Sequence, residues 1–472
     1  MDSEVSVTEK DFRPFARLGK YLSESFLAEA VDLLFLVREH GISRVTSPPT
    51  TSDEFLNFAA HTHDGWKLAQ KRIAALLTDA LTRREEARAI AKRCRRLRNR
   101  PGDQAARRDE SRIDLEIRVL RRTLDVVLWT IVVGDHSTLR RLFVIGGKHN
   151  LSIKNIADAM PTADQINEDP HSIALCTDML SLVHVGDLLV LNRKTRQFSF
   201  VELKAGDKNY RISKMAEFAA SSGCQLFEHI GTADFDKTDI KHYERAKRQI
   251  VRNHTILNTI QNEGGKDPNT GAAVNITAVE EAPDLWCDRI TNCYSQLNES
   301  KTWAIATIDK CVHVGVYSDQ DIAFVGFNSW MRGLKCESPI YNLTDSFNIP
   351  STRPLGATFL SLELQTRVLR GEILVIICLD ILRLIEMANE AQAGFLSLAS
   401  RAETAKARAI SKFQSLELNG CFVKIGTDPV FEYLGAGLRD RVVFDQQRPF
   451  QLIQHHIVRR VSPMQTVGAE DS

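Results

Sequence analysis

The chain has no large excess of charge of either sign. Its 472 residues carry 61 Lys and Arg against 60 Asp and Glu, a formal net charge of +1. The whole molecule therefore lacks the footprint of a polyanion-binding protein, and any basic surface must be local. The hydrophobic share of 43% and the charged share of 26% are ordinary for a globular protein. A chain of this length can form two or three domains, each with its own core.

Paired cysteines and long apolar runs are also missing. The nine cysteines are scattered without CxxC spacing, which argues against a zinc site and favours free thiols in a reducing, cytoplasmic setting. The most apolar stretch, Ile373 to Leu384, is too short to span a bilayer and contains Asp380 and Arg383. The first residues show no basic segment followed by an apolar core. We therefore expect neither a signal peptide nor a membrane span.

Two short apolar runs, Leu188–Leu191 and Phe198–Leu203, flank a six-residue polar turn, Asn192–Gln197. This pattern predicts an antiparallel β-hairpin. If the turn is centred between Lys194 and Thr195, Asp187 lies directly opposite Glu202. The Cβ atoms of opposed residues are roughly 4.5–5.5 Å apart, so the two carboxylates would repel each other. A divalent cation between them would remove this repulsion. Lys204, two residues after Glu202, projects from the same face of its strand.

This predicted constellation has the chemistry of a phosphodiesterase site. Mg²⁺ prefers oxygen ligands, keeps several waters and is usually held by one or two carboxylates plus a substrate phosphate. Asp187 and Glu202 would supply the carboxylates. Lys204 would orient or activate an attacking water and stabilise charge that grows on the phosphate. The expected cofactor is Mg²⁺ or Mn²⁺.

The spacing of Asp187 and Glu202-Leu203-Lys204 resembles the core motif of the PD-(D/E)xK nuclease superfamily. That superfamily has the restriction-endonuclease-like fold. Gly186 stands where the superfamily's name has proline. The resemblance extends from about Asp178 to Lys204, and more loosely over the helix that follows. It implies an α/β protein with a mixed-sheet core and the activity of a metal-dependent nuclease.

The resemblance also implies further site residues and a substrate. An acid from an upstream helix often completes such sites, and Glu168 and Asp178 both remain candidates. A helix after the Glu-x-Lys strand packs on the sheet beside the active site, so Lys247 or Gln249 would approach a substrate phosphate; a solvated basic face is the alternative. DNA is the expected substrate, and restriction or anti-phage defence is a conceivable setting.

Arginine is concentrated in one region of the chain. Between Arg83 and Arg122 fourteen arginines and one lysine stand against seven acids. Amphipathic patterns on either side of a break near Pro101 predict a helical hairpin with an arginine-rich tip. Such a tip would contact phosphate backbones, although a solvated, ion-paired helix pair or a protein partner would also fit. The tip residues proposed to bind nucleic acid are Arg93, Arg95, Arg96, Arg98, Arg100, Arg107 and Arg108.

Three consecutive regions follow from these patterns. Residues 1–125 form a helical module, 126–345 the nuclease-like core, and 346–472 a mostly helical region with a disordered tail beyond Ser462. Within the core, strand-like runs between residues 303 and 327 are expected to extend the sheet of the motif hairpin. A cluster of helices is expected from about residue 359 to 412, followed by late strands at 421–425 and 442–444.

The predicted function is a metal-dependent nuclease that hydrolyses phosphodiester bonds. The main alternative is a non-catalytic nucleic-acid-binding or assembly protein with a nuclease-like core. A third interpretation is a helical scaffold whose arginine-rich hairpin recruits an acidic protein. Nucleic acid is the expected partner, a membrane is not, and homo-oligomerisation stays open.

Overall fold

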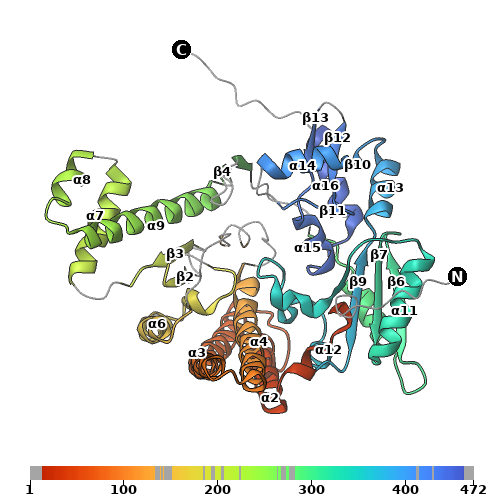
Figure 1. Cartoon of the computed structure of the whole chain (residues 1–472), viewed down its shortest axis with the longest axis horizontal. Helices are drawn as coiled ribbons and strands as arrows, with labels where there is room; N and C mark the ends of the chain where they lie inside the picture. The colour runs from red at the N-terminus through yellow and green to blue at the C-terminus, as the bar shows by residue number, and fades with distance from the viewer. Residues whose placement is uncertain are drawn as a thin grey trace. The chain divides into compact units, whose positions relative to one another are not determined.

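The computed structural model describes residues 13–132, 139, 142, 151–183, 186–192, 197–203, 207–222, 225–262, 264–266, 273–275, 282–410, 414–427 and 430–461 (Figure 1). The chain divides into two compact units. Glu24–Ala278 forms one, here called the N-terminal unit, and Met1–Ser23 with Val279–Ser472 forms the other, the C-terminal unit. Both contain helices and small antiparallel sheets, so the predicted α/β class is confirmed.

The N-terminal unit contains the predicted hairpin and the arginine-rich region. Its elements are α2 (Glu24–Arg38), the short 3-10 helix η3 (Ile42–Arg44), α3 (Ser52–Arg96), α4 (Arg100–Ile131), α6 (Ile153–Ile166), β1 (Ser172–Cys176), η4 (Thr177–Met179), β2 (Leu188–Asn192), β3 (Gln197–Val201), α7 (Asp207–Ser222), α8 (Gln225–Gly231), α9 (Lys237–Gln261), β4 (Gly264–Lys266) and β5 (Ala273–Asn275).

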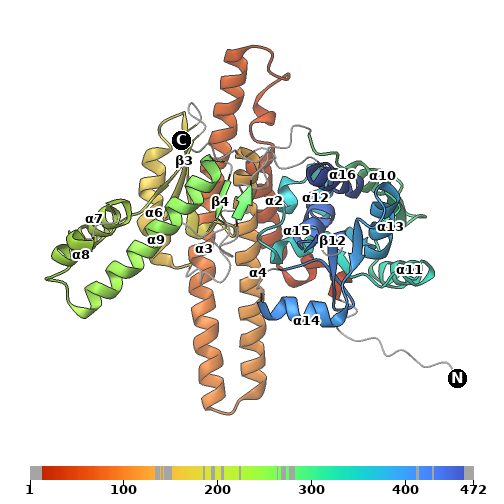
Figure 2. The same cartoon turned by 90° about the horizontal axis from the view of Figure 1, so that it is seen from above.

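Two long antiparallel helices, α3 and α4, form the predicted helical hairpin (Figure 2). A capping box starts α3: the Thr51 hydroxyl accepts from the Glu54 amide, and the Glu54 carboxylate accepts from the Thr51 amide. With 45 residues, α3 is about 68 Å long at a rise of 1.5 Å per residue. The chain reverses at Arg98, which has a φ of 55°, and the Asn99 side chain caps α4. The apolar faces are buried from His63 to Ala91 of α3 and from Ala106 to Trp129 of α4, and the two helices make the most extensive helix–helix contact among the described elements of this unit.

A three-stranded antiparallel meander follows helix α6 in the order β1-β2-β3. In β2 and β3, Leu188 pairs with Val201 and Asn192 with Gln197. This is the register expected from a turn centred between Lys194 and Thr195, two residues that lie outside the described part of the chain. Because side chains alternate along a strand, a slip of one residue would have exchanged the two faces. The register is therefore confirmed.

A buried polar network fastens this meander to α4. Arg122 and Asp125 are 1% and 0% exposed, and their side chains pair with an Nη1–Oδ2 distance of 2.8 Å. Asp125 also accepts from the Ser181 amide at 2.9 Å and from the Ser181 hydroxyl. Ser181 follows η4, so the connection between β1 and β2 is tied to the helical hairpin. Buried charges are tolerated here because they are paired and hydrogen-bonded.

The C-terminal unit has a second, separate sheet with the order β6-β7-β9-β8 and a smaller one around β12. Its elements are η1 (Arg13–Phe15), η2 (Leu18–Tyr21), α10 (Cys287–Tyr294), β6 (Trp303–Ile308), β7 (Val312–Tyr317), α11 (Gln320–Gly333), β8 (Ile340–Asn342), η5 (Leu343–Asn348), η6 (Leu355–Ala357), α12 (Leu362–Leu369), β9 (Leu374–Leu379), α13 (Ile381–Ala391), β10 (Leu396–Leu398), α14 (Arg401–Ile410), β11 (Glu417–Leu418), β12 (Cys421–Thr427), β13 (Val430–Tyr433), α15 (Gly437–Val443) and α16 (Pro449–Val461).

Several expectations for this part of the chain are wrong. The strands at 303–308 and 312–317 exist, but they do not extend the motif sheet, since β6 and β7 pair with each other and β7 pairs with β9. Residues 322–327 are helical, because Asp319 caps α11 with two backbone hydrogen bonds. Residues 442–443 end helix α15 rather than forming a strand. The apolar run at 374–379, expected in a helix cluster, is the buried central strand β9.

The division into units also differs from the expected boundaries at 125 and 345. The helical module and the motif sheet belong to one unit, since Asp125 and Ser181 join them. Phe15, at the start of the described chain, packs in the core of the C-terminal unit with Tyr317 and Phe327. The tail expected to be disordered beyond Ser462 lies outside the described residues. Among the residues that the structure describes, no helix is long and apolar enough to cross a membrane.

Replacing Asp125 by Ala should lower the free energy of unfolding by about 3–5 kcal/mol, because it removes a buried carboxylate that pairs with Arg122 and accepts from Ser181. Chemical denaturation followed by circular dichroism measures this. Arg88→Ala is the control, since Arg88 pairs with Glu110 at the helix surface and exposed pairs contribute only about 0–1 kcal/mol. An Asp125 variant as stable as the Arg88 variant would contradict the assigned role of the network.

Candidate functional site

Asp187 and Glu202 lie opposite each other at the open end of the hairpin. The ladder continues past the two strands, because the Asp187 amide donates to the Val201 carbonyl at 3.0 Å. The Leu203 amide in turn donates to Oδ2 of Asp187 at 2.6 Å. Both acidic residues are half-buried. The structure therefore brings together the two carboxylates that the sequence predicted as a pair.

Helix α9 contributes a polar side chain to this pair. The Gln249 side-chain amide donates to Oε1 of Glu202 at 2.7 Å. Lys247, the other candidate on this helix, is instead bound to Glu228, with Nζ at 2.7 and 2.6 Å from its two carboxylate oxygens. That contact lowers the pKa of Glu228. Of the two residues that the sequence left open, the structure places Gln249 at the site and holds Lys247 in an ion pair.

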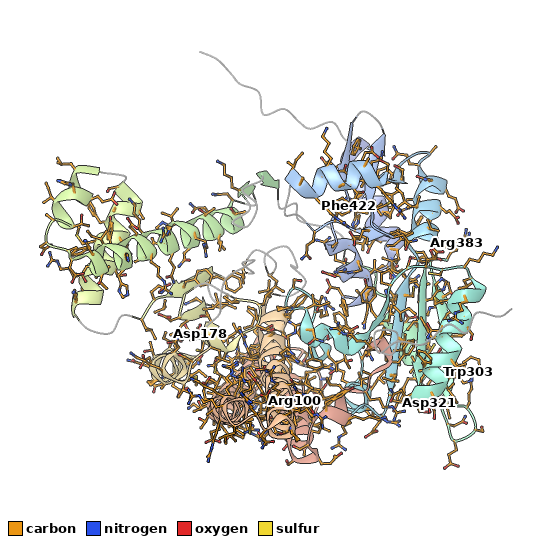
Figure 3. The ribbon with its side chains drawn as sticks, in the orientation of Figure 1. Arg100, Asp178, Trp303, Asp321, Arg383 and Phe422 are labelled. Atoms are coloured by element: carbon orange, nitrogen blue, oxygen red, sulfur yellow. The ribbon has the colours of Figure 1, made fainter. Side chains whose placement is uncertain are left out.

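Asp178 lies close to Asp187, whereas Glu168 does not. The Thr177 amide donates to the Asp187 carbonyl at 3.0 Å, and its hydroxyl donates to the Gly186 carbonyl. The next residue, Asp178 (Figure 3), accepts from the Asn155 side chain of α6 at 2.6 Å. Glu168 is exposed in the turn before β1, at the opposite end of that five-residue strand, roughly 17 Å further along at 3.4 Å per residue.

The pKa of the buried Cys176 thiol depends on the charges of Asp178 and Asp187. Cys176 is 0% exposed, and burial is the first cause that raises its pKa to about 12. The negative charges of Asp178 and Asp187 raise this pKa further. Both carboxylates therefore lie close enough to the sulfur of Cys176, at the end of β1, to raise its pKa. A thiol with this pKa stays protonated and is a poor nucleophile or metal ligand at neutral pH.

The described site consists of carboxylates and amides. Lys204, the predicted third catalytic residue, lies outside the described residues. Within the described ranges, no group of three or more His, Cys, Asp or Glu side chains is arranged to hold a metal ion. An ion at this site would therefore depend on water and substrate oxygens in addition to Asp187 and Glu202. A strongly hydrated, hard cation such as Mg²⁺ binds in that way.

Two residues of the helical hairpin position the strand that leads to Asp178. Gln70, which is 1% exposed, donates to the Ala174 carbonyl at 3.0 Å and accepts from the Cys176 amide at 3.1 Å. Arg121 donates from Nη2 to the Leu180 carbonyl just after η4. Neither residue is predicted from the sequence. A signal existed for Gln70, since it is a polar residue on the apolar face of α3 beside Ala69 and Ile73.

The arginines along the stem of the α3–α4 hairpin are paired across the two helices. Arg83 bonds Glu116 at 2.8 Å, and Arg88 bonds Glu110 at 2.7 Å. Glu116 is 2% exposed and also accepts from Arg112 at 3.0 Å. The predicted alternative of an ion-paired helix surface therefore describes the stem.

The tip of the hairpin has a different charge balance. Residues 92–108 contain eight basic side chains and one acid, Asp103. Asp103 is shared by Arg95 and Arg107, with N–O distances of 3.6 and 3.1 Å. All seven predicted tip arginines are exposed. Five of them form no ion pair within the described chain: Arg93, Arg96, Arg98, Arg100 and Arg108.

Comparison with protein-family models, with curated proteins and with solved structures gives no significant match. The arrangement of this chain's own residues is therefore the basis for a functional assignment. Two opposed, half-buried carboxylates can bind a cation, and a cation there can neutralise a phosphate. A cluster of exposed arginines can bind a polyanion.

Replacing Gln70 by Ala should destabilise the strand that leads to the site. The change leaves the buried Cys176 amide without its acceptor, which costs about 1–3 kcal/mol. Native-state hydrogen exchange should show faster exchange of that amide, together with a lower free energy of unfolding. Lys71→Ala is a neighbouring control, because the pair that Lys71 forms with Asp164 lies at the surface. Unchanged protection at Cys176 would show that Gln70 does not hold the strand.

Proposed function

We propose that the protein is a metal-dependent nuclease that hydrolyses phosphodiester bonds, with its active site at the open end of the β2–β3 hairpin. The observation that carries the proposal is the register that opposes Asp187 and Glu202. Two like charges at that spacing destabilise a hairpin that has only a structural role. A bound cation turns the same arrangement into a stable one. The resemblance to the PD-(D/E)xK motif and its restriction-endonuclease-like fold supports the same assignment.

Mg²⁺ or Mn²⁺ is the proposed cofactor. Asp187 and Glu202 fit such an ion because they offer hard oxygen ligands at a half-buried position, and burial and the nearby negative charges keep the Cys176 thiol protonated. When bound, the ion would neutralise charge on the scissile phosphate and lower the pKa of a bound water. Gln249 would hold the Glu202 carboxylate in one orientation through its hydrogen bond.

Lys204 is the proposed third catalytic residue. Its place two residues after Glu202 is the spacing that the PD-(D/E)xK resemblance assigns to the catalytic lysine. An ammonium group there would orient the attacking water and stabilise the negative charge that develops on the phosphate. Asp178 is the proposed additional acid, since it follows Thr177, whose amide bonds the Asp187 carbonyl just after β1.

The arginine-rich tip is the proposed nucleic-acid contact outside the active site. Its unpaired guanidinium groups would bind backbone phosphates and make affinity depend on salt. The preference for DNA and the defence setting rest on the family resemblance. A non-catalytic nucleic-acid-binding protein is the second candidate, because the tip could bind a polynucleotide whether or not the carboxylates support cleavage.

Asp187→Asn and Glu202→Gln should each lower cleavage by about 10²–10³-fold, by analogy with the loss of one transition-state contact. These substitutions keep side-chain shape while removing the charge that attracts the ion. Supercoiled plasmid and single-stranded oligonucleotides, with Mg²⁺, Mn²⁺ or EDTA, are the substrates and conditions. Circular dichroism verifies the fold. Metal-dependent cleavage that survives either substitution would refute the assignment, and wild-type binding without any cleavage would favour the second candidate.

Asp178 and Glu168 can be distinguished by metal affinity. Asp178→Asn should weaken Mn²⁺ binding about 10-fold or more, the usual effect of removing a group that orients or supplements metal ligands. Glu168→Gln should leave the affinity unchanged, because Glu168 lies at the far end of β1. Electron paramagnetic resonance of free Mn²⁺ measures both affinities. If Glu168→Gln weakened Mn²⁺ binding and Asp178→Asn did not, Glu168 rather than Asp178 would be the additional acid.

A further inference from the structure

Helix α9 has a line of four basic residues on one face. Lys241, Arg245, Arg248 and Arg252 are spaced by four, three and four residues. At 3.6 residues per turn these spacings place all four side chains within about 60° of one another around the helix axis. We call this set the α9 basic stripe. It spans about 16 Å along the axis at 1.5 Å per residue.

The stripe is exposed, and its charges are not neutralised. All four side chains are exposed, and none forms an ion pair with another residue in the described ranges. The basic residues of helix α7, which packs against α9, do form ion pairs. Lys208 bonds Asp239 at 2.7 Å, Arg211 bonds Asp234 at 2.6 Å, and Lys214 bonds Glu217 at 3.0 Å. An ordinary solvated helix tends to intersperse charges of both signs; here the one nearby acid, the exposed Glu244, lies at the edge of the stripe, about 40° from Arg248, and forms no ion pair with it among the described contacts.

The stripe lies beside the candidate active site. Gln249 follows Arg248 directly and comes one helical turn after Arg245. Its side chain therefore lies about 40° from that of Arg245 around the helix. The Gln249 amide reaches Oε1 of Glu202 at 2.7 Å. The opposite face of α9 is occupied, since the buried Tyr243 packs against Ile212 and Ala216 of α7.

We propose that the α9 basic stripe is a track for one strand of the nucleic-acid backbone, which it guides to Asp187 and Glu202. This inference rests on the proposed nuclease function and adds the surface that aligns the substrate. Phosphates of one B-DNA strand advance about 3.4 Å per nucleotide along the helix axis. Because the strand also winds around that axis, a straight stripe of about 16 Å follows it over only two or three phosphates. Arginine suits this role because its guanidinium donates two parallel hydrogen bonds to a phosphate.

Substitution of three arginines of the stripe tests the proposal. The variant Arg245→Gln, Arg248→Gln, Arg252→Gln should weaken binding of a 30-base-pair duplex and reduce the slope of log K against log salt by about 2.7, or 0.9 per lost phosphate contact. The charge-matched control is Lys208→Gln, Arg211→Gln, Lys214→Gln, which removes three paired cations from the neighbouring helix. Fluorescence anisotropy between 50 and 200 mM salt, in EDTA, measures binding without cleavage.

The outcomes separate this inference from the nuclease assignment. A reduced slope in the stripe variant alone supports the track, whatever the plasmid assay shows for Asp187→Asn. Equal losses in the stripe and control variants would overturn it, because net charge alone would explain the binding. A wild-type protein without polynucleotide affinity at about 100 mM salt would also overturn it, and an acidic protein would become the better partner for these cations.

Discussion

The structure of the candidate site depends on the register of one β-hairpin. Because side chains alternate in direction, pairing Leu188 with Val201 fixes the face of the sheet on which each residue of β2 and β3 lies. The same register opposes Asp187 and Glu202 just beyond the last ladder pair. One backbone amide, that of Leu203, and one side-chain amide, that of Gln249, bond to these carboxylates. These donors orient the two carboxylates, and two opposed carboxylates are the ligand set that a hard divalent cation takes in the proposed site.

The rest of the N-terminal unit can be understood as the support of this hairpin. Helices α3 and α4 hold β1 and the following turn through Gln70, Arg121 and Asp125, so rigid helices rather than loops set the position of Asp178. Charge is also distributed unevenly. Cations along the α3–α4 stem are paired, whereas five arginines at its tip and the four residues of the α9 stripe have no partner among the described residues. A nearly neutral chain thus presents two local basic surfaces.

Local pattern was enough to predict the hairpin register and the helical hairpin, because turn position and amphipathic spacing are properties of neighbouring residues. Contacts between distant segments could not be predicted in this way. Gln249 meets Glu202 across 47 positions, and Lys247 is held by Glu228. The apolar run of β9 was assigned to a helix because burial on both faces removes the alternation that identifies a strand. Conversely, the composition of residues 322–327 favours a strand, but the N-cap at Asp319 starts a helix there.

The central claim is that Asp187 and Glu202 jointly bind a divalent cation. The most direct measurement is anomalous X-ray diffraction from crystals of the protein soaked in Mn²⁺. The account predicts an anomalous peak within coordination distance of oxygens from both carboxylates, slightly beyond the roughly 2.0–2.1 Å of Mg²⁺–oxygen bonds. Crystals that take up Mn²⁺ elsewhere, with no peak between these two side chains, would contradict it.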